Sequence, residues 1–124
     1  MSDPYIYHIC RAEEWAASQG EARYGGSTQD LADGFIHFST GAQVRASAAK
    51  HRAGQAGLVL LRVAAGKVGD GLKWEPSRGG ALFPHVYGGL PRDAVVRVDD
   101  LPLDGDGRHR FPADLDDIPS EEAS

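Results

Sequence analysis

Three histidines of this sequence lie inside apolar segments, where an imidazole needs either a hydrogen-bonding partner or a function. The segments are YIYHIC with His8, GFIHFST with His37 and FPHVYG with His85. An imidazole can bind a metal or transfer a proton near neutral pH, so each of the three is a candidate for chemistry. The other two have ready structural explanations, because His51 belongs to a basic helix end and His109 to an acidic, solvated C-terminal stretch.

The stretch FIHFS has the composition of a strand, and its histidine alternates with two large apolar residues. Side chains alternate across a strand, so His37 and Ser39 share one face while Ile36 and Phe38 share the other. We predict that Ile36 and Phe38 pack under the helices. His37 and Ser39 are then expected to project together from the opposite face, close enough to contact one ligand.

A second candidate group follows in LKWEP and FPHVYG, where aromatic residues surround a histidine and a carboxylate. If FPHVYG is extended, its aromatic side chains share one face with His85. Ligand clefts combine apolar walls with a few convergent polar groups, so a small-molecule ligand is expected to bind where these segments meet. The catalytic candidates are His8, His37, Glu75 and His85, and the ligand-binding candidates are Ser39, Thr40, Trp74, Phe83 and Tyr87.

Two more specific chemistries find little support in the spacing. Three neutral imidazoles could bind zinc, but paired ligands at short separation, as in His-Glu-x-x-His, are absent from the sequence. A nucleophilic triad built on Ser39 lacks the Gly-x-Ser-x-Gly turn. Because the zinc pattern is absent, no metal site is assigned.

GGSTQD and FSTG could present backbone amides to a phosphate or carboxylate at a helix N-terminus, although many helices that bind no anion share this pattern.

The charge of the chain is concentrated at its C-terminal end. Residues 104–124 hold seven acidic and two basic residues, whereas residues 1–103 hold eleven of each, so the net charge of −5 belongs to the last part. We predict one domain in residues 1–103, followed by an acidic, largely disordered tail in residues 104–124. A neutral body with an acidic tail disfavours nucleic-acid binding, which needs clustered Lys and Arg.

Composition also bounds the environment of the protein. No stretch approaches the ~20 apolar residues of a membrane helix, and the N-terminus MSDPYIYHIC lacks the pattern of a signal peptide, so a cytoplasmic protein with no membrane partner is expected. The single cysteine, Cys10, lies in an apolar segment and is predicted to be a small buried residue rather than a reactive thiol.

Local patterns predict strands at residues 5–10, 35–39, 58–64 and 94–101 and helices at residues 11–20, 27–33 and 42–52. Residues 65–89 are rich in glycine and predict only short strand or loop pieces. Ser27 with Asp30 and Thr40 with Gln43 resemble capping boxes, and Gly34 follows as a helix stop. The small residues Ala42, Ala46 and Ala49 are expected to pack the third helix on a sheet. These elements predict a single compact α+β domain.

In this order and at these separations, YIYHI, GFIHFST, LKWEP and FPHVYGGLP closely resemble a family of small bacterial proteins, domain-of-unknown-function family 952. The resemblance covers about residues 5–103. It implies a fold similar to that of the ADP-ribosyltransferase-like group, with two small β-sheets and helices packed on them. In that group NAD or a related nucleotide lies in a cleft between the two sheets, which is an analogy of fold only.

The resemblance also implies roles for individual residues. His8, on the first strand, would hold the ribose and amide side of NAD. Ser39 and Thr40 would match the Ser-Thr pair that supports such sites. Glu75 is the apparent counterpart of the glutamate that stabilises an oxocarbenium-like transition state, although it precedes Pro76 instead of lying on a late strand.

Two functions follow from these observations. The first is a small-molecule or nucleotide-binding protein, with NAD as the cofactor or substrate class and glycosyl or ADP-ribosyl transfer as the activity. The alternative is a non-catalytic protein-interaction module, in which the aromatic stretch from Trp74 to Tyr87 contacts a protein partner, since Trp and Tyr are favoured interface anchors.

Overall fold

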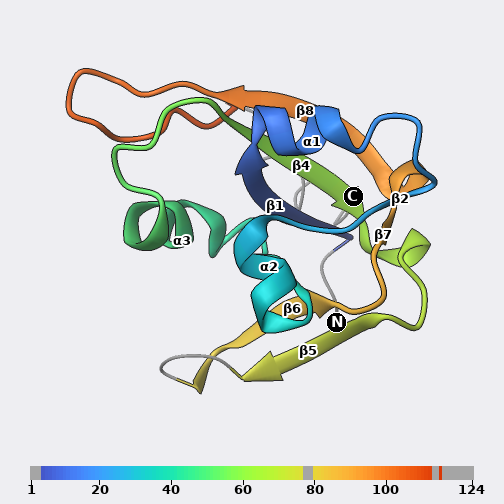
Figure 1. Ribbon diagram of the computed structural model, residues 1–124. Coiled ribbons are helices and arrows are strands. Elements are labelled where there is room, and N and C mark those ends of the chain that lie inside the picture. The colour runs from blue at the N-terminus through green and yellow to red at the C-terminus, as the bar shows by residue number, and fades with distance from the viewer. Residues whose placement is uncertain (1–3, 77–79, 113–114, 116–124) are drawn as a thin grey trace.

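A computed structural model describes residues 4–76, 80–112 and 115 of the chain (Figure 1). The strands are β1 (Tyr5–Arg11), β2 (Arg23–Tyr24), β3 (Ile36–His37), β4 (Leu58–Ala64), β5 (Leu72–Pro76), β6 (Leu82–Val86), β7 (Leu90–Pro91) and β8 (Val95–Leu101). The helices are α1 (Ala12–Ala17), α2 (Thr28–Asp33) and α3 (Val44–His51), with 3-10 turns η1 (Ala65–Lys67) and η3 (Arg92–Ala94). The predicted α+β class is confirmed.

The strands of the described chain form three antiparallel sheets where two were expected. Their orders are β1-β4-β8, β2-β7 and β3-β6-β5. The extra sheet arises because Arg23 and Tyr24, in a stretch with no strand pattern, pair with Pro91 and Leu90. Figure 1 shows the β3-β6-β5 sheet below α2 and the β1-β4-β8 sheet above it.

The predicted strand at residues 35–39 is shorter than expected, because the chain changes sheets within it. Ile36 and His37 pair with Val86 and His85 of β6, whereas Ser39 exchanges two backbone hydrogen bonds of 2.8 Å with Tyr7 of β1. This short segment therefore joins the β3-β6-β5 sheet to the β1-β4-β8 sheet.

The central strand β4 separates two apolar clusters. Ile6, Cys10, Leu61 and Val63 lie in the larger cluster, which also includes Ile36, Phe38 and Val86 from the second sheet. The other face contributes Tyr7, Leu58, Leu60 and Leu101 to a smaller cluster with Val44 of α3. Burial of these apolar faces is the main driving force for packing the sheets together. The prediction that Cys10 is a buried residue is confirmed.

The helix signals in the sequence are largely confirmed. Ser27 and Asp30 form a capping box at the start of α2, and Gly34 ends it in the left-handed conformation at φ 86°. Thr40 and Gln43 exchange side-chain hydrogen bonds of 3.0 and 3.1 Å with each other's backbone just before α3.

The predicted packing face of α3 is wrong. Ala42, Ala46 and Ala49 are exposed, whereas Val44 and Ala48 are buried. Residues four apart stack on one helix face, and the larger valine side chain gives that face more apolar area than an alanine row offers.

The described part of the acidic end packs on the domain. Leu103 forms a bridge with His109, and Leu115 is buried in the smaller cluster. The remainder of the predicted tail, residues 113–114 and 116–124, lies outside the described residues. Among the helices that the structure describes, none has the length and apolar composition needed to cross a membrane.

Gly26 is required by its surroundings as well as by its backbone. Its φ is 101°, and a Cβ built there would lie 2.7 Å from Asp30 Cβ and 3.1 Å from Ile36 Cγ1. Gly20 has a similar φ of 93° with no atom within 4 Å of a built Cβ.

We expect Gly20→Ala to lower the free energy of unfolding by about 1–2 kcal/mol through the left-handed conformation alone. Gly26→Ala should lower the free energy of unfolding by distinctly more, since the added methyl group also displaces Asp30. Chemical denaturation of both variants measures the difference, and equal losses would show that crowding at Gly26 is unimportant.

Candidate functional site

Strand pairing places four of the predicted site residues on one face of the β3-β6-β5 sheet. His37 lies opposite His85, and Glu75 lies opposite Phe83. Directly opposed residues of antiparallel strands point to the same side of the sheet. We call this surface the histidine face, and its side chains are those of Phe35, His37, Lys73, Glu75, Phe83, His85 and Tyr87.

His85 and Glu75 form a hydrogen-bonded pair on this face. His85 Nδ1 lies 2.7 Å from Glu75 Oε1, and the same oxygen accepts a hydrogen bond of 2.8 Å from the Tyr87 hydroxyl. These two bonds lower the pKa of Glu75, the bond from His85 contributing most, and the bond to Glu75 raises the pKa of Tyr87. A carboxylate on Nδ1 fixes the tautomer of the imidazole and leaves Nε2 to accept a proton.

Phe35 connects the two halves of the histidine face. Its ring stacks on His85 at a centroid distance of 4.2 Å and contacts His37 at 4.6 Å and Tyr87 at 5.3 Å. The rings of His37 and His85 are 5.8 Å apart and nearly perpendicular. Phe35, which was not among the predicted ligand-binding residues, therefore places its ring against His37, His85 and Tyr87.

His37 is an imidazole between two carboxylates. Its Nδ1 lies 2.6 Å from Asp30 Oδ1, and its Nε2 lies 3.1 Å from Asp33 Oδ2. The hydrogen bond to Asp30 is the largest cause of the raised pKa of His37, and burial opposes it. With 43% of its side chain exposed, His37 presents a positive charge at the edge of the histidine face.

Asp30 is buried and connects α2 to β3 and to His8 of β1, whose Nε2 lies 3.5 Å from Asp30 Oδ2. Oδ2 accepts a hydrogen bond from the Ser27 backbone, while Oδ1 accepts one of 3.1 Å from the His37 backbone. Burial acts to raise the pKa of Asp30, but the bonds from His37 and Ser27 outweigh it and lower the pKa to about 2. Asp30 is thus a buried carboxylate that stays ionised because its partners satisfy it.

His8 lies beneath the histidine face and does not reach it. The residue is 3% exposed, its Nδ1 lies 2.6 Å from the His37 carbonyl oxygen and its Nε2 lies 2.9 Å from the Tyr24 hydroxyl. A carbonyl only accepts, so Nδ1 donates and Nε2 accepts from Tyr24. Burial lowers the pKa of His8 and keeps the ring neutral.

The remaining predicted residues are not brought together on this face. Ser39 is buried and donates a hydrogen bond of 2.9 Å to Ser47 of α3, and Thr40 caps the turn before α3. Trp74 lies opposite Pro84 and packs against the larger cluster. The expectation that His37 and Ser39 project together is wrong, because the chain changes sheets between them.

Sequence reasoning interpreted Asp30 only as a helix cap and assigned no role to Asp33 or Phe35. The signals were present, since Asp33 precedes His37 by four residues and Phe35 precedes it by two. The link between Asp30 and His37 has no fixed spacing because it depends on how α2 folds back over β3.

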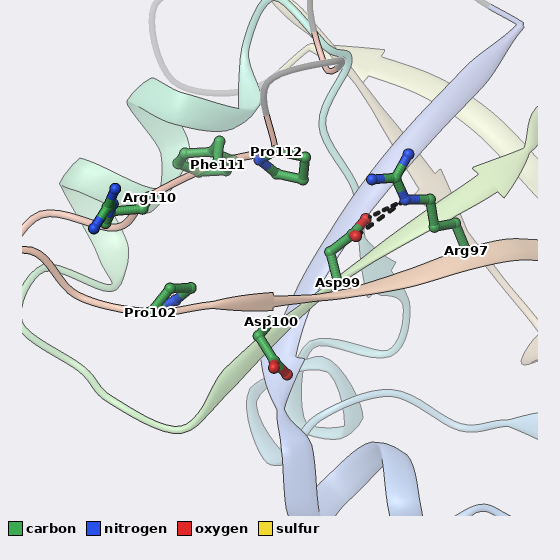
Figure 2. A pocket seen from close by; sticks show the side chains of 7 residues that line it. All are labelled: Arg97, Asp99, Asp100, Pro102, Arg110, Phe111 and Pro112. Carbon is green, nitrogen blue, oxygen red and sulfur yellow. Dashed lines mark hydrogen bonds and ion pairs between the residues drawn. The ribbon is translucent and has the colours of Figure 1, made fainter.

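A shallow hollow elsewhere contains none of the predicted site residues. It has a volume of about 580 Å³ and lies between β8 and the chain that follows it (Figure 2). Within residues 4–76, 80–112 and 115, no group of three or more His, Cys, Asp and Glu side chains is arranged to hold a metal ion.

Asp30→Asn should lower the pKa of His37 toward its ordinary value of 6.5, because the bond to Asp30 is the largest cause of the shift. Asp33→Asn removes a carboxylate that is more exposed and lies farther from the His37 ring, so it should lower the pKa of His37 less. Histidine side-chain NMR titration measures both, and an unchanged His37 pKa in Asp30→Asn would contradict the assigned charge state.

Asp30 should also determine stability in acid. Its pKa is about 2 in the folded chain against 3.8 ordinarily, so its contribution is present above pH 4 and is lost as the pH falls from 4 to 2. A shift of this size corresponds to about 2 kcal/mol. Denaturant unfolding of the wild type and Asp30→Asn across this range should show the acid-dependent loss only in the wild type.

His37 acts in the opposite direction. Its raised pKa contributes stability below pH 6.5 that is lost as the pH rises through the folded-state value.

The comparisons with known proteins agree with this fold. The chain matches solved structures of protein CC0527 from Caulobacter crescentus at 50% sequence identity. A crystal structure aligns with a TM-score of 0.84 over 90% of this chain and 98% of that one, and a solution NMR structure aligns with a TM-score of 0.75 over 93% and 97%. No curated protein matches the chain. Residues 9–98 match the model described as "Protein of unknown function (DUF952)", and the chain belongs to that family.

Proposed function

We propose that the histidine face binds a small ligand with a planar, cationic ring, and that the ligand class is NAD and related nucleotides. The observation that carries the proposal is the unit formed by His85, Glu75 and Tyr87, stacked on Phe35 beside His37. Aromatic rings next to carboxylates attract a flat cation more than a neutral ring. The nicotinamide ring of oxidised NAD has this character.

The charges of the face support a cationic ring. Asp30 and Asp33, which bind the two ring nitrogens of His37, and Glu75 are acidic, whereas His37 and Lys73 are basic, so the histidine face together with these two aspartates carries a net charge of −1 when His37 is protonated. Phe35 and Tyr87 supply two aromatic rings whose centroids are 5.3 Å apart. An anionic group of the ligand would then be placed near Lys73, which is exposed on β5.

A transfer reaction would use His85 as the base. In the described chain no hydrogen bond engages His85 Nε2, whereas its Nδ1 is held by Glu75. Nε2 would take the proton of an acceptor hydroxyl or of water as the acceptor oxygen bonds to the ribose carbon. The bond from that carbon to nicotinamide breaks, and its electron pair leaves with the ring, which becomes neutral. General bases of this kind contribute about 10²–10⁴-fold in rate.

His8, Ser39, Thr40 and Trp74 have no direct contact with the ligand in this proposal. His8 acts through the His37 carbonyl, which it holds in place. The ADP-ribosyltransferase-like arrangement, with NAD between two sheets and His8 on the ribose, is replaced here by a ligand on the open face of one sheet.

A protein-interaction function has one observation in its favour. Leu82, at the start of β6, and Tyr87, directly after its end, are 52% and 38% exposed. Trp74, the other expected anchor, packs against the core with part of its surface. A protein partner would therefore contact Leu82 and Tyr87 rather than Trp74.

Ligand titrations followed by NMR test the proposed function. We expect oxidised NAD and N-methylnicotinamide to shift the resonances of His85 and Tyr87, and uncharged nicotinamide, reduced NAD and ADP-ribose to bind at least tenfold more weakly. Glu75→Gln and Phe35→Leu should weaken binding by about tenfold, whereas His51→Ala on α3 serves as a folded control with unchanged binding. Uniform absence of shifts with every ligand would overturn the proposal and favour the protein-interaction function.

A further inference from the structure

Strand β8 forms an edge of the β1-β4-β8 sheet. In the described chain it pairs with β4 alone, so its other side carries backbone groups that no strand of this chain engages. Figure 1 shows β8 along the outer side of the molecule. An edge of this length is a template for a further strand.

The side chains of β8 are unusual for a protected edge. Val96 and Val98 are 48% and 42% exposed, and they belong to the few large apolar side chains that the described chain exposes to this degree. Pairing with β4 is regular from Leu58↔Leu101 to Arg62↔Arg97 and shifts only beyond that point. The segment from Arg97 to Leu101 is therefore a regular edge with an apolar residue near its centre.

Two opposite charges of β8, Arg97 and Asp99, lie on the face of the strand opposite to Val96 and Val98. Arg97 Nε lies 2.9 Å from Asp99 Oδ2, and both side chains project to the same side of β8, while Asp100 projects to the opposite side (Figure 2). These two charges are two residues apart with Val98 between them. The arrangement is self-complementary when the strand is turned around.

We propose that β8 pairs in antiparallel fashion with β8 of a second copy of this chain, with the symmetry axis at Val98. This register places Val98 opposite Val98 and Arg97 opposite Asp99 at two equivalent positions. Opposite charges at directly opposed positions stabilise a strand pair, and like charges destabilise it. The result is a continuous six-stranded sheet with isologous contacts.

Neighbouring registers are excluded by the same charges. Centring the pair on Arg97 places two arginines opposite each other, and centring it on Asp99 places two aspartates opposite each other. The registers that keep side chains on the same face of the joint sheet have the symmetry axis at a residue, so the nearest alternatives to Val98 are Arg97 and Asp99. Both of these alternatives place like charges opposite each other. The hollow beside Arg97 and Asp99 leaves space for the side chains of the second copy.

Charge reversal tests the proposal. We expect the wild type to dimerise with increasing concentration in sedimentation velocity and to dissociate as salt is added, because the paired charges are partly exposed. Arg97→Asp and Asp99→Arg should each weaken dimerisation at least tenfold. Mixing these two variants should restore a dimer, since each charge of one chain then meets its opposite on the other.

Three controls make the outcome decisive. The double variant R97D/D99R should dimerise as the wild type does, Lys50→Asp on the exposed side of α3 should have no effect, and the His37 titration should be unchanged in every variant. Circular dichroism checks that the single variants are folded. A wild type that stays monomeric at all concentrations would overturn the proposal, as would a mixture of folded single variants that fails to associate.

Discussion

The buried carboxylate of Asp30 is the interaction on which the arrangement of this protein depends. It caps α2 through Ser27, accepts a hydrogen bond from the backbone of β3 and binds the ring of His37. A buried charge is costly unless its oxygens are satisfied, so the three contacts stabilise one another. Gly26 is part of the same constraint, because any side chain there would occupy the space of Asp30.

This constraint explains how three sheets with short strands form one domain. β3 is only two residues long, and the chain leaves it for β1 within two further residues. A strand pair of this length is marginal by itself. Asp30 and the bond from His8 to the His37 carbonyl hold the crossing in place from both sides. The ring nitrogens of His8 therefore stabilise the junction of the sheets, since an apolar residue at this position could not form a hydrogen bond with the His37 carbonyl.

Local features of the fold could be predicted from the sequence, and contacts between distant segments could not. The Ser27–Asp30 capping box, the end of α2 at Gly34 and the buried strand at residues 58–64 depend on nearest neighbours, and each is confirmed. The third sheet depends on the pairing of residues 23–24 with 90–91, which no local pattern encodes. The packing face of α3 was predicted wrongly for the same reason, because contacts with the sheet determine which side of the helix is buried.

The candidate site shows the same division. Alternation along β6 correctly placed Phe83, His85 and Tyr87 on one side, because alternation is a property of a single strand. The partnership of His85 with Glu75 required the register of β5 against β6, and that of His37 with Asp30 required the fold of α2. A histidine in an apolar segment indicates that a polar partner exists, but it does not identify the partner.

The three imidazoles differ in charge because their partners differ, and this decides which of them can transfer a proton. His8 is kept neutral by burial, with one nitrogen donating to a carbonyl and the other accepting from a hydroxyl. His37 is kept charged by two carboxylates that engage both of its nitrogens. His85 alone combines an orienting carboxylate on one nitrogen with a second nitrogen that no hydrogen bond in the described chain engages. In the proposed transfer reaction the base would therefore be His85, while His37 supplies a fixed charge and His8 holds the His37 carbonyl in place.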